Sequence, residues 1–202
     1  MAASTLILAS SSAQRRALLQ QIGFDPLCIA ADIDETPRVG ETAAEYVQRL
    51  SLEKCQVVAA EHRDSVVVGS DTTISIGTRI LGKAENIEQA IETLSLLSET
   101  QHSVFTGVTV SAGGKYKSKV CETQVEFGLL TKDDIRAYWN SGEPQGKAGS
   151  YAIQGLGAVF VKAIHGSYSN VVGLPLHEVA ALLNHFGMPV LRDTSVAGAG
   201  KL

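Results

Sequence analysis

The prediction of an α/β fold starts from the stretch Val66-Val67-Val68-Gly69-Ser70-Asp71-Thr72. Its first four residues form a continuous apolar run, which predicts a buried strand, and the polar residues after it predict the end of that strand. Ligands of α/β folds usually lie at this end of a strand. Asp71 is therefore a candidate to bind a metal ion or to activate water. The alternative is structural, because a carboxylate in this place can also accept backbone N–H bonds in a turn.

Helical and extended patterns follow one another on both sides of this stretch. Helices are expected at Ala13–Ile22, Ala43–His62, Ile87–Leu97, from the Thr131 cap to about Ser141, and at Leu176–Phe186. Strands are expected at Thr5–Ala9 and Ala158–Ile164, and as hairpins at Thr73–Ile76 with Arg79–Leu81 and at Val104–Ser111 with Lys115–Phe127. The glycine-dense stretch Gly142–Gly173 is expected to form loops that could serve a site.

Composition places the chain among globular proteins. It has 202 residues, of which 45% are hydrophobic and 19% are charged, and this fits a single domain over residues 1–202 built from two lobes that share a core. Small side chains near the end predict a flexible tail at about 195–202. No apolar run is long enough for a membrane span or a signal peptide, so we expect a cytoplasmic protein with no membrane partner.

Charge and cysteine usage limit the possible partners. The net charge of −4 gives no general attraction for nucleic acid, so an anionic ligand would need a local cluster of cations. The cysteines Cys28, Cys55 and Cys121 are scattered singly, and we expect free thiols in the core. The five histidines show no close spacing that suggests metal ligation and are expected to be structural.

A candidate phosphate site lies in Ser10-Ser11-Ser12-Ala13-Gln14-Arg15-Arg16. These residues join an expected strand to an expected helix. The first N–H groups of a helix are unpaired and lie at the positive end of its macrodipole, so hydroxyl groups and Arg15 beside them would complete a phosphate cradle. The alternative is an ordinary helix cap with solvated arginines.

Three further charged residues become candidates only if the fold brings them to Asp71. Glu35 belongs to the acidic stretch Asp32–Glu35, and such stretches are usually only solvated. Lys54 lies on the expected long helix, and Lys83 follows the first hairpin. Taken alone, the sequence favours surface positions for both lysines.

Together these segments resemble the Maf family, the septum-formation inhibitor relatives that act as nucleoside triphosphate pyrophosphatases. The resemblance covers nearly the whole chain, from about Leu6 to Phe186, and its matches occur in the family's order. In the first half of the chain they are Leu8-Ala9-Ser10-x-Ser12 with Arg15, then Asp34-Glu35, Arg49-Leu50, Glu53-Lys54, Gly69-Ser70-Asp71-Thr72 and Gly82-Lys83.

The C-terminal half resembles the subgroup that acts on dTTP and UTP. Its matching runs are Lys147–Gly157, Gly166-Ser167-Tyr168 and Val171–Leu176. In the 7-methyl-GTP subgroup the residue after the aspartate is typically glutamine, and the position of Gln154 is typically glutamate. Thr72 and Gln154 therefore point to the dTTP and UTP branch.

Three departures from the family pattern bear on the base that is bound. Gln14 replaces the first arginine of the usual Ser-Pro-Arg-Arg, a position tied to base specificity, and Arg16 lies one step too late to take that role. The stretch Asp34–Arg38 looks more like the 7-methyl-GTP branch, and Ala84 replaces the usual proline. The resemblance thus supports the reaction type more strongly than the choice of base.

The resemblance implies a fold of the Maf and inosine-triphosphatase type. This is a long mixed β-sheet in two lobes, flanked by helices, with the nucleotide in a central cleft. The implied catalytic residues are Asp71, which accepts a proton from the attacking water, and Lys54 and Lys83, which neutralise the triphosphate together with Arg15. Glu35 and Asp71 are expected to hold a divalent cation, namely Mg, Mn or Co.

The remaining implied contacts concern the substrate and partners. Ser10, Ser12 and Arg15 are expected to bind phosphate, and Gln154, Gln14 and Thr72 to shape the base pocket. The partners expected are a nucleoside triphosphate and a second copy of the chain in a homodimer. Two alternatives stay open here: a pyrophosphatase for 7-methyl-GTP or modified purine nucleotides, and a nucleotide-binding regulator of cell division.

Overall fold

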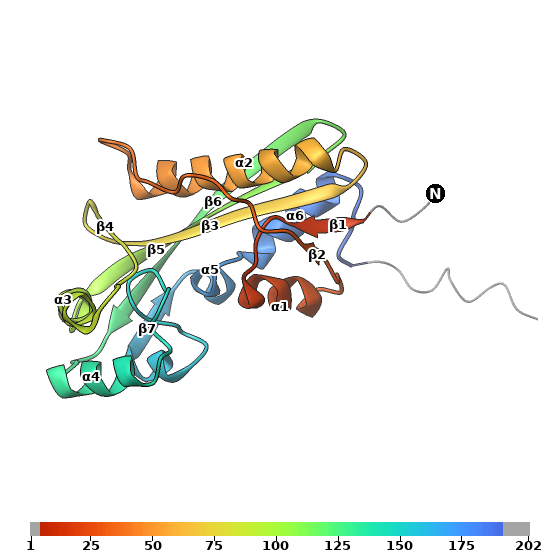
Figure 1. Ribbon diagram of the computed structural model, residues 1–202. Helices are drawn as coiled ribbons and strands as arrows, with labels where there is room; N and C mark the ends of the chain where they lie inside the picture. Colours follow the sequence, from red (N-terminus) through yellow and green to blue (C-terminus); the bar gives the residue numbers. More distant parts are fainter. Residues whose placement is uncertain (1–4, 192–202) are drawn as a thin grey trace, which may run out of the picture.

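The computed structural model describes residues 5–191, and within them seven strands form one mixed sheet flanked by helices (Figure 1). The strands are β1 (Leu6–Leu8), β2 (Leu27–Cys28), β3 (Val66–Ile76), β4 (Arg79–Leu81), β5 (Gln101–Ala112), β6 (Lys115–Phe127) and β7 (Val161–His165). The helices are α1 (Ala13–Gln21), α2 (Ala43–Glu61), α3 (Ile87–Leu97), α4 (Lys132–Asn140), the 3-10 helix η1 (Leu156–Phe160), α5 (Tyr168–Val172) and α6 (Leu176–His185). The predicted α/β fold with a long mixed sheet is confirmed. The tail predicted at 195–202 lies outside the described residues.

The sheet is mixed because its short first strands are parallel to β3 and its long strands are antiparallel. The strand order is β2-β1-β3-β5-β6-β7, with β4 added to the far part of β3. β1 runs parallel to both β2 and β3, whereas β3, β5, β6 and β7 pair in antiparallel fashion. Three long strands thus extend through the molecule, and shorter strands attach at their two ends.

β3 does not end at Ser70 as predicted. It continues to Ile76, and its pairing with β5 runs without interruption from Val67 opposite Ser111 to Ser75 opposite Ser103. Polar residues continue this strand because hydroxyl groups of β5 are buried beside them, and Thr72 Oγ1 lies 2.9 Å from Thr106 Oγ1. The separate short strand predicted from Thr73 is therefore wrong, and Asp71 lies within a strand.

One half of the sheet is covered by helices on both faces. Successive strand residues point to opposite faces. Ile7 and Val67 pack with Cys55 and Val58 of α2, while Leu8 is among the residues that pack on the other side with α1 and α6. This arrangement buries every residue of β1, as its continuous apolar sequence predicts.

α2 lies unusually close to the sheet because two glycines face it. A Cβ atom on Gly69 would lie 2.3 Å from the Ser51 carbonyl oxygen, and one on Gly107 would lie 2.1 Å from that of Val47. The helix begins at a capping box in which Thr42 and Glu45 bond to each other's backbone N–H groups. The close approach of α2 to Gly69 and Gly107 fixes the distance of the helix from the sheet and its register along β3. It thereby also fixes the side chains that α2 directs toward β3.

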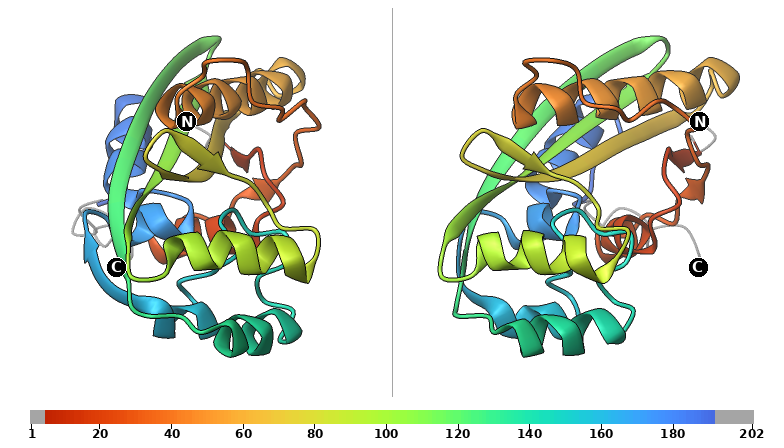
Figure 2. Two further views of the ribbon diagram at one scale, coloured as in Figure 1. Left: turned by 90° about the vertical axis from the view of Figure 1, so that its left-hand side faces the viewer. Right: turned by 60° about the vertical axis from the view of Figure 1, so that its left-hand side comes forward.

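The other half of the sheet carries a second apolar cluster. Ile74, Val104 and Val125 of the long strands pack there with α3, α4 and the segment around Tyr151. Figure 2 shows α3 and α4 side by side at this end of the molecule. The strand predicted at Ala158–Ile164 begins later than expected, because residues 156–160 form η1 and only Val161–His165 pairs with β6.

The structure also bears on two smaller predictions, which concern the three cysteines and membrane-spanning helices. Cys28, Cys55 and Cys121 are free, but only Cys55 is buried, whereas Cys28 is exposed and Cys121 is half-buried. Cys28 is exposed because β2 is a two-residue edge strand. Of the helices in residues 5–191, none combines the length and the apolar character that crossing a membrane requires.

Candidate active site

A gap along one edge of β3 opens the sheet to a hollow. β1 pairs with β3 only at Val66–Val68, and β4 pairs with it only at Ile74–Ile76. Between these two partners, the edge of β3 carries no other strand of the described chain. Asp71 and Thr72 point to opposite faces of the sheet, yet both line the same hollow because it wraps around this open edge.

The hollow has a volume of about 950 Å³, which is at the upper end of the range for small-molecule sites. Its walls come from segments that are distant in sequence, between Ser10 and Gly173. Among the lining residues are all those singled out from the sequence, namely Ser10, Ser12, Gln14, Arg15, Glu35, Lys54, Asp71, Thr72, Lys83 and Gln154. The structure therefore brings the predicted residues into one cavity.

Lys54 joins two carboxylates in the wall next to α2. Its Nζ lies 2.6 Å from Asp71 Oδ1 and 2.6 Å from Glu35 Oε1. The side chains of Lys54 and Asp71 are each only 9% exposed, so neither is the solvated surface group that the sequence alone favoured for Lys54. Asp71 lies in a strand and bonds to a lysine, so the alternative that it accepts backbone bonds in a turn is wrong.

Glu35 reaches this pair from the loop between β2 and α2. Tyr46 donates a hydrogen bond of 2.8 Å to the Glu35 carbonyl. Arg49 donates to the carbonyl of the next residue, Thr36, at 3.2 Å. Arg49 also donates two bonds of 2.6 and 2.8 Å to the Glu41 carboxylate in the same loop. Burial raises the pKa of Glu35, but the neighbouring Lys54 outweighs it and the net shift is downward. The carboxylate is therefore held in its charged form.

Arg15 lies in the opposite wall, at the start of α1. It donates from Nε to Gly173 O at 2.9 Å, from one terminal nitrogen to Ser10 Oγ at 3.3 Å, and from the other to Thr72 Oγ1 at 3.1 Å. These partners are all neutral. Burial lowers the pKa of Arg15, and the charges of Asp71 and Glu35 act against that shift. Within residues 5–191 no carboxylate is paired with this guanidinium, so its charge is available to an anion.

The serines before α1 act both as a helix cap and as part of the cavity wall. Ser12 is the N-cap and accepts a bond from the Arg15 N–H at 3.4 Å, while Ser10 Oγ accepts one from the Ser12 N–H at 3.2 Å. Arg16 is exposed and pairs with Asp25, as expected of a solvated arginine. The cap alternative therefore holds for Ser12 and Arg16, but it does not describe Arg15.

The carbonyl of Gly173 ties this wall to the sheet. It accepts bonds from Arg15, from Ser70 Oγ at 3.2 Å and from Thr72 Oγ1 at 3.4 Å. The φ angle of Gly173 is 121°, a conformation that other residues rarely adopt. The sequence pointed to this region through its density of glycines and through the family resemblance of Val171–Leu176, but it assigned no role to Gly173.

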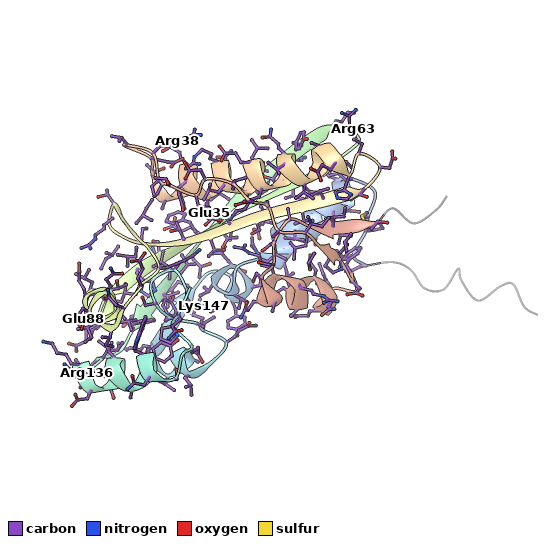
Figure 3. All side chains as sticks on the ribbon, in the orientation of Figure 1. Glu35, Arg38, Arg63, Glu88, Arg136 and Lys147 are labelled. Carbon is purple, nitrogen blue, oxygen red and sulfur yellow. The ribbon has the colours of Figure 1, made fainter. Side chains whose placement is uncertain are left out.

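Lys83 and Lys147 place two more cations at the entrance. Lys83 Nζ lies 3.7 Å from Glu35 Oε2, and its side chain is 60% exposed. An isolated backbone bridge joins Lys83 to Ala148, next to Lys147. Figure 3 labels Glu35 below α2 and Lys147 nearer to α4, and both residues line the hollow. Lys147 and Tyr46 were not predicted as site residues, since nothing in their spacing relates them to Asp71.

The residues predicted to read the base also line the hollow. Gln154 is exposed, follows the buried Tyr151 and Ile153, and makes no hydrogen bond to another described residue. Gln14 accepts a bond from Ser12 Oγ at 3.3 Å. Thr72 is bonded to Arg15 and lies near Gly173, so in this structure it supports the guanidinium and does not present a free hydroxyl to a base.

The donor set fits a hard divalent cation. Within the described residues no group of three or more His, Cys, Asp or Glu side chains forms a complete metal cage. Mg²⁺ is commonly held by only one or two carboxylates together with substrate phosphates, and Glu35 and Asp71 supply two such carboxylates. In this structure Lys54 Nζ lies between the two carboxylates and offsets one of their two negative charges.

Comparison with known proteins relates the whole of this arrangement to one family. A family model described as "Maf-like protein" matches residues 5–186. A protein of Colwellia psychrerythraea named dTTP/UTP pyrophosphatase is 51% identical over 187 residues, covering 90% of this chain and 88% of the relative. Relatives of the same name from Myxococcus xanthus and Acinetobacter baylyi are 48% and 44% identical, covering 92% and 87% of this chain and 94% and 96% of their own lengths.

Among solved structures, the Ham1 protein of Staphylococcus aureus is similar with a TM-score of 0.42 and 18% sequence identity. The match covers 61% of this chain and 72% of that protein.

Proposed function

The chain belongs to the Maf-like family, and on this premise we propose that it hydrolyses dTTP and UTP to the nucleoside monophosphate and pyrophosphate. One observation carries the proposal more than any other. Three cations that are distant in sequence, Arg15, Lys54 and Lys83, line the same hollow as Asp71 and Glu35. A hollow with this charge pattern suits a triphosphate together with the groups needed to hydrolyse it.

Asp71 is the residue best placed to accept a proton from the attacking water. Its Oδ1 accepts a hydrogen bond of 2.6 Å from Lys54 Nζ, which fixes the direction of the carboxylate. A carboxylate held in this way can act as a general base on a water molecule within hydrogen-bond reach. The role of Asp71 as a general base is separate from substrate binding, because the proton is transferred only when the water attacks the phosphate.

The cations act mainly on the leaving group. A triphosphate bears roughly four negative charges, and displacement of pyrophosphate adds charge to the leaving oxygen, so cations placed there stabilise the transition state more than the ground state. Arg15 is held by three neutral acceptors and can offer its full charge to phosphate. Lys83, which is more exposed, can close onto the phosphates from the entrance.

Glu35 and Asp71 would hold a divalent cation such as Mg²⁺, Mn²⁺ or Co²⁺. When bound, such an ion polarises phosphoryl oxygens and offsets their charge. For both carboxylates to ligate it, Lys54 must leave the space between them, and the phosphates of the substrate offer the ammonium group an alternative partner. The protein therefore supplies a lysine that can pass from carboxylate to phosphate when the substrate enters.

Gln154 would read the edge of the base. Its amide has both donors and an acceptor, and it makes no hydrogen bond to another described residue. It can therefore bond to the donors and acceptors on the edge of thymine or uracil. Gln14 lies in the wall near Arg15 and would shape the same pocket. Thr72 contributes indirectly through its bond to Arg15.

A panel of nucleoside triphosphates tests this function. The protein is incubated with dTTP, UTP, CTP, dATP, GTP and 7-methyl-GTP, each with Mg²⁺, Mn²⁺ or Co²⁺, and pyrophosphate and orthophosphate are measured separately. We expect pyrophosphate and the monophosphate in equal amounts, with dTTP and UTP the best substrates. Release of orthophosphate in steps, or a preference for 7-methyl-GTP, would overturn the proposal.

The alternatives receive less support. The relatives named dTTP/UTP pyrophosphatase favour the pyrimidine substrates over 7-methyl-GTP. Retention of a charged Asp71 and Lys54 pair within the hollow favours an enzyme over a regulator that only binds nucleotide. The homodimer and the cytoplasmic location stay predictions.

A further inference from the structure

The loop that carries Gln154 is held from behind by one carboxylate. Glu143, which follows α4, accepts a bond of 2.8 Å from the Leu156 N–H on Oε2 and one of 2.9 Å from the Gly157 N–H on Oε1. These N–H groups begin η1, whose N-cap Gly155 has no side chain to satisfy them. A residue distant in sequence thus performs the function of a helix cap.

Tyr138 extends this contact to the other side of Gln154. Its hydroxyl donates to Glu143 Oε1 at 2.8 Å and accepts from the Ala152 N–H at 3.0 Å. Ala152 lies two residues before Gln154, and Leu156 lies two residues after it. The two anchors therefore hold both ends of a short segment, and only Ile153, Gln154 and Gly155 lie between them.

The glycines of the loop fit closely against these two side chains. A Cβ atom on Gly155 would lie 2.1 Å from Glu143 Oε2, and one on Gly157 would lie 2.6 Å from the Tyr138 hydroxyl oxygen. The backbone angles of Gly155 are −137° and −145°, so glycine is needed here for space and not for a positive φ. The close fit shows that the loop and the carboxylate are matched in shape as well as in hydrogen bonding.

Glu143 is charged in the folded protein. Burial raises its pKa, but the N–H groups of Gly157 and Leu156 and the Tyr138 hydroxyl outweigh this and lower it. Hydrogen bonds to a charged acceptor are stronger than those between neutral groups. The anchor is therefore stiff, although it lies outside the hollow itself, since neither Glu143 nor Tyr138 is among the lining residues.

We propose that Glu143 and Tyr138 are positioning residues that fix the Gln154 segment against the base of the nucleotide. The inference rests on the proposed function only in assuming that Gln154 contacts the base. A backbone segment that is mobile before binding loses conformational entropy when the nucleotide orders it, and a segment already held by hydrogen bonds loses less. The anchor thereby raises affinity for the substrate without touching it.

A double-mutant cycle separates this role from a merely structural one. We expect Glu143→Gln to raise KM for dTTP by about tenfold, since an amide cannot accept both N–H bonds and the hydroxyl bond equally well, with kcat nearly unchanged. Gln154→Ala should raise KM by a similar factor. If Glu143 acts through Gln154, the double variant should be little worse than Gln154→Ala alone. Effects on KM that multiply independently would overturn the inference.

The matched control is Asp134→Asn. Asp134 is also a carboxylate that accepts a backbone N–H, at the opposite end of α4, and it lies outside the hollow. This variant should lower thermal stability and leave KM for dTTP unchanged. If Asp134→Asn raises KM as much as Glu143→Gln, the effect is one of general stability and the inference fails.

A second variant keeps the test decisive if Glu143→Gln does not fold. Gly155→Ala keeps Glu143 but adds a methyl group that pushes its carboxylate away from the loop, so KM for dTTP should rise as it does in Glu143→Gln. Tyr138→Phe, which removes only the hydroxyl bonds, should show a smaller rise in KM. Release of pyrophosphate by the wild type is measured alongside. No release from dTTP would refute the proposed function, whereas normal release with an unaltered KM in Gly155→Ala and Glu143→Gln would refute this inference alone.

Discussion

The roles of Arg15 and Arg16 differ although they are neighbours in sequence. Arg15 points into the hollow and bonds to Ser10, Thr72 and Gly173, whereas Arg16 is exposed and pairs with Asp25. The sequence named Arg15 for a phosphate cradle and left open an ordinary helix cap in which both arginines are solvated. The direction of a helical side chain depends on how the helix packs, and that is set by Leu18 and Leu19 in the core.

Substitution of these two arginines gives a direct contrast. Arg15→Ala should lower kcat/KM for dTTP by roughly a hundred- to thousandfold, the usual effect of losing one preorganised charged contact. Arg16→Ala should change it by less than about twofold, because exposed ion pairs contribute little. Steady-state assays of pyrophosphate release measure both. Equal losses of kcat/KM in the two variants would contradict the separate roles of Arg15 and Arg16.

Asp71→Asn should impair turnover more than binding. The amide keeps the shape of the side chain but cannot accept the proton, so at saturating divalent cation kcat should fall by about a hundred- to ten-thousandfold while KM changes little. Normal hydrolysis of dTTP by this variant would remove Asp71 from the mechanism. A circular dichroism melt shows whether the variant folds, since the substitution also weakens the bond to Lys54.

If Glu35 and Asp71 hold the proposed divalent cation, Lys54 competes with it for the two carboxylates in the free protein. In Lys54→Met this competition is gone, so Mn²⁺ binding without nucleotide should strengthen by more than about tenfold even though catalysis is lost. Lys83→Met is the matched control, because Lys83 lies 3.7 Å from Glu35 alone and is largely exposed. Electron paramagnetic resonance of free Mn²⁺ measures the affinity. Weaker binding in Lys54→Met would contradict the assignment of Glu35 and Asp71 as ligands.

The helix α2 delivers Lys54 to β3 through a contact between backbones. Lys54 lies one residue before Cys55, whose backbone nitrogen and Cβ would touch a side chain at Gly69. The sequence predicted this helix almost to its ends, because its apolar spacing and capping residues are local features. It could not predict the depth of the contact, because Gly69 and Gly107 are opposed to α2 only in the folded sheet.

Gly107→Ala should therefore separate α2 from the sheet. A Cβ there would lie 2.1 Å from the Val47 carbonyl oxygen, which is backbone and cannot rotate away. We expect the free energy of unfolding to fall by about 1–3 kcal/mol and kcat to fall further than the unfolded fraction explains. Gly128→Ala is the control, since its nearest atom would be 4.0 Å away. Chemical denaturation and activity on the same samples test this, and full activity in Gly107→Ala would contradict it.

Several elements were predictable and others were not, for physical reasons. Helices and hairpins with local signals were found, including the turn at Gly113-Gly114, where both residues have positive φ. β3 was predicted to end too early because polar residues usually mark strand ends, whereas here Thr72 bonds to Thr106 of β5 and Ser70 donates to the Gly173 carbonyl. η1 was missed because its cap, Glu143, lies more than ten residues away in sequence.

Across the whole molecule, the site depends on where strands do not pair. β1 and β4 leave a gap on the edge of β3, and around that gap segments from both halves of the chain meet. Local sequence could identify Asp71, Lys54 and Arg15 as candidates but not their convergence, which follows from strand order. Resemblance to a family supplied that information, and the coordinates give the geometry.

The stability of the molecule should depend on pH through His102. This histidine is buried against Phe127 and Tyr151, and burial lowers its pKa from 6.5 to about 4. Between these values the unfolded chain binds a proton that the folded protein does not, so the free energy of unfolding falls as pH decreases from 6.5 to 4, by at most about 3 kcal/mol. Replacing His102 with Gln should remove this part of the slope in denaturation curves. Parallel curves for wild type and variant would contradict it.

The central claim is that a triphosphate binds in the hollow beside the open edge of β3. Diffraction from crystals grown with a dTTP analogue that carries an imido bridge between its α and β phosphates tests this directly. We predict that the phosphates lie within hydrogen-bond distance of Arg15, Lys54 and Lys83, with Lys54 moved away from Asp71 and the base next to Gln154. A nucleotide bound elsewhere, with Lys54 still between Glu35 and Asp71, would contradict the account.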